Sequence, residues 1–340
     1  MAARAFITGL AGPALTTGER AFLREARPWG LILFKRNIDN NAQVIRLVND
    51  FIDAIDDASA PVLVDQEGGR VQRLGPPHWP AYPPGAAYGD IYRRDNAAGL
   101  RAAWLGARLI AADLLPLGIN VDCLPLADVP VRGSDRVIGD RAYGETPDQV
   151  AAIAGAVAEG LLAGGVLPVL KHIPGHGRAS SDSHLRLPVV LAERFELEAT
   201  DFAAFRPLNG LPLGMTAHVV FTAFDPVLPV TTSATMIRDV IRGLIGFDGL
   251  LMSDDVSMGA LSGSIGERTR ASLAAGCDLV LHCNGRLDEM QAVAAQAPEL
   301  AGAAARRAAA ALARRGAPVQ IDLDEARREF AALIGAPIAS

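Results

Sequence analysis

The chain has 340 residues, of which 50% are apolar and 21% are charged, and this length allows one large domain or two ordinary ones. With 32 basic and 38 acidic side chains the net charge is −6, which gives no general attraction to nucleic acid or anionic lipid. Three cysteines without a C-x-x-C pair argue against a disulfide framework. Neither a secretory apolar segment nor a membrane span is present, so we expect a soluble, cytoplasmic protein.

Eight short apolar runs recur along the chain, each flanked by Gly or Pro and followed by a segment with helical spacing. Nearly continuous apolar runs of this kind are typical of strands that are covered on both faces, as in a parallel sheet. The runs lie at residues 6–10, 30–34, 61–65, 119–124, 167–172, 213–218, 249–254 and 278–282.

Helical segments are predicted between these runs. The clearest begins at Thr146 and Pro147, an N-cap followed by proline, and stops at Gly164. Eight strand–helix units indicate an α/β fold in the form of a (β/α)8 TIM-type barrel, with a doubly wound open sheet as the alternative. The barrel is favoured because no Gly-rich dinucleotide turn follows the first run. The other predicted helices lie near residues 40–57, 95–115, 193–207, 233–245, 266–276 and 287–297.

The end of the chain predicts a C-terminal helical extension at about residues 298–340. An Ala-rich helix is expected over 299–315, with paired arginines at 306–307 and 314–315 on one side. A solvated helix lying on the barrel explains these arginines better than a nucleic-acid face does. We therefore expect a single, monomeric barrel domain over 1–340.

Polar side chains end most of the apolar runs, at the end of a barrel where active sites lie. Each of them taken singly has a structural explanation. Together they carry a desolvation cost that only mutual pairing or a bound ligand can offset, so the set predicts a functional site. The residues are Asp65, Asp122, Asp128, Lys171, His172, His218, Asp254, Asp255 and His282.

The densest polar segment runs from Lys171 to His184 and contains Asp182 two residues before His184. An aspartate in this position can hold the imidazole in one tautomer and raise its basicity, while the other ring nitrogen faces a reactant. The proline and glycines of the segment predict a loop that can move. Two alternatives are a purely structural Asp–His hydrogen bond and a metal site made of Asp182, His172, His184 and His218, although no ordinary metal-ligand spacing supports the latter.

Asp254 and Asp255 end the seventh run as adjacent carboxylates. One of them is a candidate nucleophile, and the other is suited to cap the next helix or to pair with an arginine. Local physics does not choose between the two.

Four separated segments resemble, in order, those of glycoside hydrolase family 3, and within it the bacterial β-N-acetylhexosaminidases of the NagZ type. The segments are residues 64–73 (VDQEGGRVQR), 138–144 (IGDRAYG), 171–184 and 252–258 (MSDDVSM). One local difference is that such enzymes commonly read Gly-His-Gly-Asp-Thr in the loop, whereas here Arg178 follows the second glycine.

The resemblance implies a retaining exo-enzyme that removes terminal β-linked N-acetylglucosamine (GlcNAc) through a covalent glycosyl-enzyme. Its implied substrate is a peptidoglycan turnover fragment, GlcNAc linked to 1,6-anhydro-N-acetylmuramic acid with or without peptide. Asp254 matches the nucleophile, and His184 matches the general acid/base with Asp182 as its partner. The implied sugar-binding residues are Asp65, Arg73, Arg141, Lys171 and His172. No cofactor, metal, nucleic acid or membrane partner is implied.

The arginines also have structural interpretations, in which Arg141 pairs with Asp140 and Arg73 with Glu67.

Three alternatives to the hydrolase stay open at this point. A phosphorylase is one, because a neutral histidine base does not repel phosphate as a carboxylate would. The others are a metal-dependent barrel hydrolase and a non-catalytic sugar-binding barrel.

Overall fold

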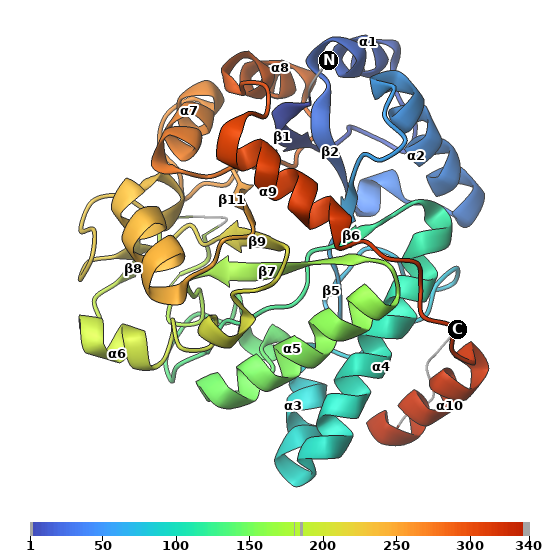
Figure 1. The fold of residues 1–340 in the computed structure, drawn as a ribbon, viewed down its shortest axis with the longest axis vertical. Helices are drawn as coiled ribbons and strands as arrows, with labels where there is room; N and C mark the ends of the chain where they lie inside the picture. The colour runs from blue at the N-terminus through green and yellow to red at the C-terminus, as the bar shows by residue number, and fades with distance from the viewer. Residues whose placement is uncertain (1–2, 180, 184–185, 336–340) are drawn as a thin grey trace.

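The structure is a computed structural model that describes residues 3–179, 181–183 and 186–335. Within these residues eight parallel strands close into a barrel, and their order around it is their order along the chain (Figure 1). All eight predicted runs are strands, and the predicted (β/α)8 barrel is confirmed. The strands are β1 (Arg4–Thr8), β2 (Pro28–Leu33), β3 (Val62–Val64), β6 (Val121–Asp122), β7 (Leu167–Ile173), β9 (Leu213–Thr216), β11 (Leu250–Asp255) and β12 (Leu279–His282).

Helices surround the strands on the outside of the barrel (Figure 1). The best-marked prediction is correct, since Thr146 caps α5 and Gly164 ends it. The helices are α1 (Thr17–Ala26), α2 (Asn41–Ile55), α3 (Gly85–Arg94), α4 (Asn96–Leu114), α5 (Pro147–Ala163), α6 (Arg194–Ala199), the π-helical segment η6 (Met236–Ile245), α7 (Ile265–Ala275), α8 (Leu287–Gln296), α9 (Gly302–Ala313) and α10 (Leu323–Ile334).

Two helix predictions need correction. The helix predicted over 193–207 is the short α6, because Thr200 leaves helical geometry (φ −121°, ψ −79°) and its hydroxyl donates back to the carbonyl oxygen of Glu196. At the C-terminus the predicted Ala-rich helix is α9, and a second helix, α10, follows it and packs on α4. The alternation of charged and apolar residues over 323–334 is the sequence signal that indicates α10.

The core has two layers, one inside the barrel and one between the strands and the helices. Helix α9 adds to the inner layer, because Ala308 and Ala311 belong to the same buried cluster as Leu167 and Leu213, the first residues of β7 and β9. Arg307 on the same helix forms ion pairs that reach the loops before β11 and β12. Helix α9 therefore covers the amino-terminal end of the barrel, across which it runs in Figure 1.

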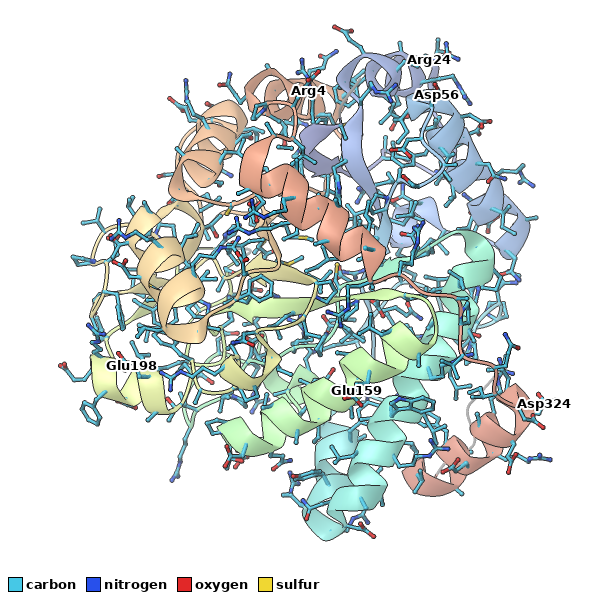
Figure 2. The ribbon with its side chains drawn as sticks, in the orientation of Figure 1. Arg4, Arg24, Asp56, Glu159, Glu198 and Asp324 are labelled. Carbon is cyan, nitrogen blue, oxygen red and sulfur yellow. The ribbon has the colours of Figure 1, made fainter. Side chains whose placement is uncertain are left out.

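Charged side chains lie on the outer faces of the helices. Arg24, Glu159 and Asp324, on three different helices, are exposed, and Figure 2 shows Arg24 and Asp324 at the edge of the molecule. In the part of the chain that the structure describes, no helix has the length and apolarity needed to cross a membrane.

Candidate active site

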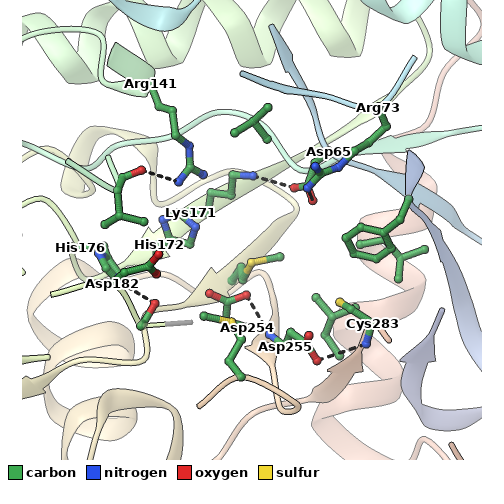
Figure 3. Close-up of a pocket in the computed structure, with 18 of the residues that line it drawn as sticks. Asp65, Arg73, Arg141, Lys171, His172, His176, Asp182, Asp254, Asp255 and Cys283 are labelled. Atoms are coloured by element: carbon green, nitrogen blue, oxygen red, sulfur yellow. Dashed lines mark hydrogen bonds and ion pairs between the residues drawn. The ribbon is translucent and has the colours of Figure 1, made fainter. Parts of the chain in front are cut away.

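A cavity of about 460 Å³ opens at the carboxyl ends of the strands (Figure 3). Loops that follow different strands contribute to its wall, because parallel strands of a barrel all end at the same rim. His184 lies outside the described residues. The other residues assigned catalytic or sugar-binding roles all line this cavity, and they are Asp65, Arg73, Arg141, Lys171, His172, Asp182 and Asp254. Four further residues of the predicted strand-end set are buried but do not line it, and they are Asp122, Asp128, His218 and His282.

Lys171 on β7 is the buried centre of one wall, with its side chain only 2% exposed. Its Nζ lies 2.9 Å from Oδ1 of Asp65 and 2.6 Å from Oε1 of Glu67. An ammonium group is stable in such a place because two carboxylates balance its charge. Burial alone would raise the pKa of Asp65, but Lys171 and Arg73 outweigh it and hold that pKa well below its usual range.

The arginines of this wall do not form the pairs predicted as their structural alternatives. Arg141 forms a two-pronged ion pair with Glu67, with both N–O distances 2.8 Å, rather than with Asp140. Arg73 pairs with Asp65 at 3.0 Å rather than with Glu67. The wall is therefore one continuous network of charges.

Sequence reasoning missed Glu67 as the link between the two cations. The available signal was the spacing of Asp65 and Glu67, because residues two apart in an extended segment point to the same side. The pKa of Glu67 is lowered, since Lys171 and Arg141 outweigh the effect of burial.

His172 is oriented by Asp128, a buried residue in the loop after β6. The Nδ1 atom of His172 lies 2.7 Å from Oδ2 of Asp128, so this nitrogen carries the proton. The other oxygen of Asp128 accepts the backbone N–H of His176 at 2.6 Å. One carboxylate thus fixes both the ring that faces the cavity and the start of the following loop.

His176 also lines the cavity, although the sequence analysis gave it no role. Its Nε2 lies 3.0 Å from the hydroxyl of Ser183, and Nδ1 has no hydrogen-bond partner among the described residues. Burial and the neighbouring His172 lower the pKa of His176 to about 4, so the ring is neutral near pH 7.

Lowering the pH from about 6.5 to about 4 is expected to reduce the free energy of unfolding through His176. The folded-state pKa lies below that of the unfolded chain, so in this window only the unfolded chain gains the proton and acid favours unfolding. Urea unfolding at about pH 7 and about pH 4.5 measures the effect. His176→Gln should remove up to about 1.4 kcal/mol per pH unit from the decline. Equal slopes in the two proteins would contradict the assignment.

The adjacent carboxylates at the end of β11 have different surroundings. Asp255 accepts hydrogen bonds from the backbone N–H groups of Ser257 and Cys283 and from the Ser257 hydroxyl. Asp254 accepts the backbone N–H of Asp255 at 2.8 Å and lines the cavity on the side opposite Lys171 (Figure 3). The backbone contacts of Asp255 hold the strand end on which Asp254 is presented.

His218 does not line the cavity. Its Nδ1 lies 2.7 Å from the Thr231 hydroxyl and its Nε2 lies 3.0 Å from the carbonyl oxygen of Asp255, so it supports the strand end from behind. Across residues 3–179, 181–183 and 186–335, no three His, Cys, Asp or Glu side chains are grouped so that they could hold a metal ion. Both ring nitrogens of His218 are occupied by these two hydrogen-bond contacts, and a metal ion at either nitrogen would displace one of them.

Residues 13–314 match the family description "Glycosyl hydrolase family 3 N terminal domain". The chain belongs to glycoside hydrolase family 3. The family expected from the sequence motifs is thus confirmed.

Relatives within family 3 carry related names. A protein of Alkalilimnicola ehrlichii named β-hexosaminidase is 42% identical over 282 residues, which is 81% of this chain and 79% of that protein. NagZ from Neisseria gonorrhoeae, solved in complex with N-trifluoroacetyl-D-glucosamine, superposes with a TM-score of 0.87 at 31% identity and covers 100% of this chain and 99% of its own. A family 3 β-N-acetylglucosaminidase from Paenibacillus has a TM-score of 0.86 at 30% identity, covering 97% of this chain and 66% of that chain.

Proposed function

We propose that this family 3 protein is a retaining exo-β-N-acetylglucosaminidase. The observation that carries the proposal is a single cavity in which Asp254, from β11, and Asp182, from the loop after β7, face a wall of buried charges. The β-hexosaminidase names of relatives and the aminosugar derivative bound to the gonococcal NagZ support the same substrate class.

In the first half-reaction, a carboxylate oxygen of Asp254 bonds to the anomeric carbon as the bond to the leaving oxygen breaks. The leaving oxygen takes a proton from the general acid. In the second half-reaction, the same group removes a proton from water, whose oxygen displaces Asp254 from the anomeric carbon. Two inversions give net retention at this carbon.

His184 is the proposed general acid/base, and Asp182 is its partner. An unperturbed histidine side chain has a pKa of about 6.5, so it can give a proton in one half-reaction and take one in the other at little cost in free energy. Asp182 would stabilise the imidazolium and hold its tautomer. Asp182 lines the cavity, which supports this assignment from the partner's side.

The proposed sugar-binding residues are suited to hydroxyl groups. Charged donors and acceptors make stronger hydrogen bonds to hydroxyls than neutral groups do, and here they are already oriented by their mutual ion pairs. The group comprises Asp65, Arg73, Arg141, Lys171 and His172. The proposed natural substrate is the peptidoglycan fragment GlcNAc–1,6-anhydro-N-acetylmuramic acid, with or without peptide, met in the cytoplasm by a monomer.

The decisive experiment is proton NMR of the first product formed from this disaccharide. Release of GlcNAc as its β-anomer, before mutarotation, is expected, because two displacements restore the starting configuration. Initial formation of the α-anomer would rule out the retaining mechanism. Lack of turnover of any β-GlcNAc glycoside would favour the sugar-binding barrel instead.

Product identity in phosphate buffer separates the hydrolase from the phosphorylase. We expect free GlcNAc to remain the main product, with full activity after exhaustive chelation, because the proposed steps use only side chains of this chain. GlcNAc 1-phosphate as the main product would instead identify a phosphorylase. Loss of activity on chelation, restored by a divalent metal, would identify the metal-dependent alternative.

A further inference from the structure

The segment from Lys171 to His184 is called the catalytic loop below, after its proposed role. In it Arg178 stands where similar enzymes commonly have aspartate, and Arg178 does not line the cavity. Its guanidinium forks into three hydrogen bonds with the 194–201 segment. Nε donates to Oδ2 of Asp201 at 3.0 Å, Nη1 to Oε1 of Glu196 at 2.6 Å and Nη2 to the hydroxyl of Thr200 at 3.0 Å.

The contact with Asp201 is sheltered from water, whereas the Glu196 side chain is 42% exposed. The side chain of Arg178 is 15% exposed and that of Asp201 is 1% exposed. Surface ion pairs are weak because solvent competes for both partners, whereas a buried partner left alone is strongly disfavoured. The planar fork of arginine also fixes direction, which a lysine in its place would not do.

The residues just before Arg178, which form the base of the loop, are packed tightly. A Cβ atom at Gly177 would come within 2.1 Å of the carbonyl oxygen of Val129, and one at Gly175 (φ +143°) would lie 3.2 Å from Cβ of Asp201. In this structure the two glycines allow close packing of the loop base. The base of the loop is therefore fixed to the barrel and to the 194–201 segment.

The anchor is near Asp182 along the chain. Four residues span at most about 14 Å, so the position of Arg178 limits where Asp182 can reach. The next residue along the chain is itself held, because the carbonyl oxygen of Ala179 accepts the backbone N–H of Asp135 at 2.9 Å. Beyond Asp182, the carbonyl oxygen of Ser183 accepts the backbone N–H of Ala260 at 3.1 Å.

We propose that Arg178 is a positioning residue whose fork on the 194–201 segment sets the reach of the catalytic loop toward Asp254. The inference rests on the proposed function, in which this loop supplies the acid/base group. Because Asp254 stands on β11, which Arg178 does not contact, loss of the anchor should impair proton transfer and leave the nucleophile in place.

The dependence of kcat/KM on the leaving group distinguishes impaired proton transfer from a displaced nucleophile. A 2,4-dinitrophenolate leaves without protonation, whereas a methoxide leaving group requires the general acid. In Arg178→Ala, kcat/KM for methyl β-GlcNAc is expected to fall about 10- to 100-fold, while that for 2,4-dinitrophenyl β-GlcNAc stays within about threefold. The kcat for the dinitrophenyl substrate should fall, because water still needs a base, and azide should restore it.

Arg194→Ala is the matched control. Arg194 lies on α6 and pairs with Glu198 at 2.6 Å, but its side chain is 62% exposed and does not contact the loop base. We expect this variant to keep both kcat/KM values. Arg178→Lys, which keeps the charge and loses the fork, should show an intermediate split between the two substrates.

Equal losses of kcat/KM on both substrates, or no loss on either, would overturn the role of Arg178. If Arg178→Ala does not fold, Arg178→Lys and Asp201→Asn provide the same comparison. If neither variant loses more kcat/KM on the methyl than on the dinitrophenyl substrate, the role of Arg178 is overturned. His184→Ala separates this inference from the proposed function. A split in His184→Ala without one in the Arg178 variants refutes the positioning role alone, whereas no split in His184→Ala refutes the acid/base assignment itself.

Discussion

Replacement of Asp254 by alanine is expected to lower the rate of glycoside hydrolysis by about 10⁴-fold or more. In the proposed mechanism this carboxylate forms the covalent bond of the first step, and alanine cannot form it. Binding of GlcNAc should be nearly retained, because the ion-pair network around Lys171 is unchanged. Initial rates and calorimetric titration with GlcNAc measure the two effects.

Asp255→Asn is the matched control for the nucleophile. A 2-acetamido-2-deoxy-5-fluoro glycosyl fluoride should label Asp254 in the natural protein and in Asp255→Asn, and label nothing in Asp254→Ala. The control is expected to be less stable, since it weakens the contacts with Ser257 and Cys283. A label on any residue other than Asp254 would refute the nucleophile assignment.

The largest effect on stability is expected from Lys171→Met. Methionine is one atom shorter than lysine and is uncharged. It leaves the carboxylates of Asp65 and Glu67 in a buried wall without the ammonium group that both contact. Breaking a buried ion pair from one side costs about 3–5 kcal/mol, so the free energy of unfolding should fall by that amount. Urea unfolding at neutral pH measures it, and affinity for GlcNAc should fall in parallel.

The chain offers a direct control, because its only other lysine, Lys35, is exposed. Lys35→Met should change the free energy of unfolding by less than about 0.5 kcal/mol. Adding Glu67→Gln to Lys171→Met should cost less than the sum of the two single variants, since the second change removes one of the two carboxylates that lost the charge of Lys171 in the first. Strict additivity would show that the network does not act as a unit.

Much of the barrel could be predicted because each strand carries its own local signal. Runs such as 167–172 are apolar, short and bounded by Gly or Pro, and no long-range information is needed to assign them. The polar residues that end the runs could be placed together for the same reason, because the barrel geometry brings every strand end to one rim. Asp65 and Lys171, 106 positions apart in the chain, were placed in one site in this way.

Pairing within the site could not be predicted from sequence. Arg141 had Asp140 beside it in the chain, but it reaches Glu67, which is presented 74 positions earlier by a different loop. The partners of Arg178 were hidden for a similar reason, because the 194–201 segment was expected to continue as a helix through Asp201. These contacts depend on how loops meet above the barrel, and neither propensity nor periodicity carries that information.

Helix α9 has a consequence for the order of events in turnover. The interior of the barrel is packed with side chains and α9 lies over its far end, so in the proposed reaction both fragments of a cleaved substrate leave through the opening by which the substrate entered. In the proposed mechanism the aglycone leaves when the glycosyl-enzyme forms, and the monosaccharide is released last. Free GlcNAc should accordingly compete with incoming substrate, which makes its accumulation a natural brake on the enzyme.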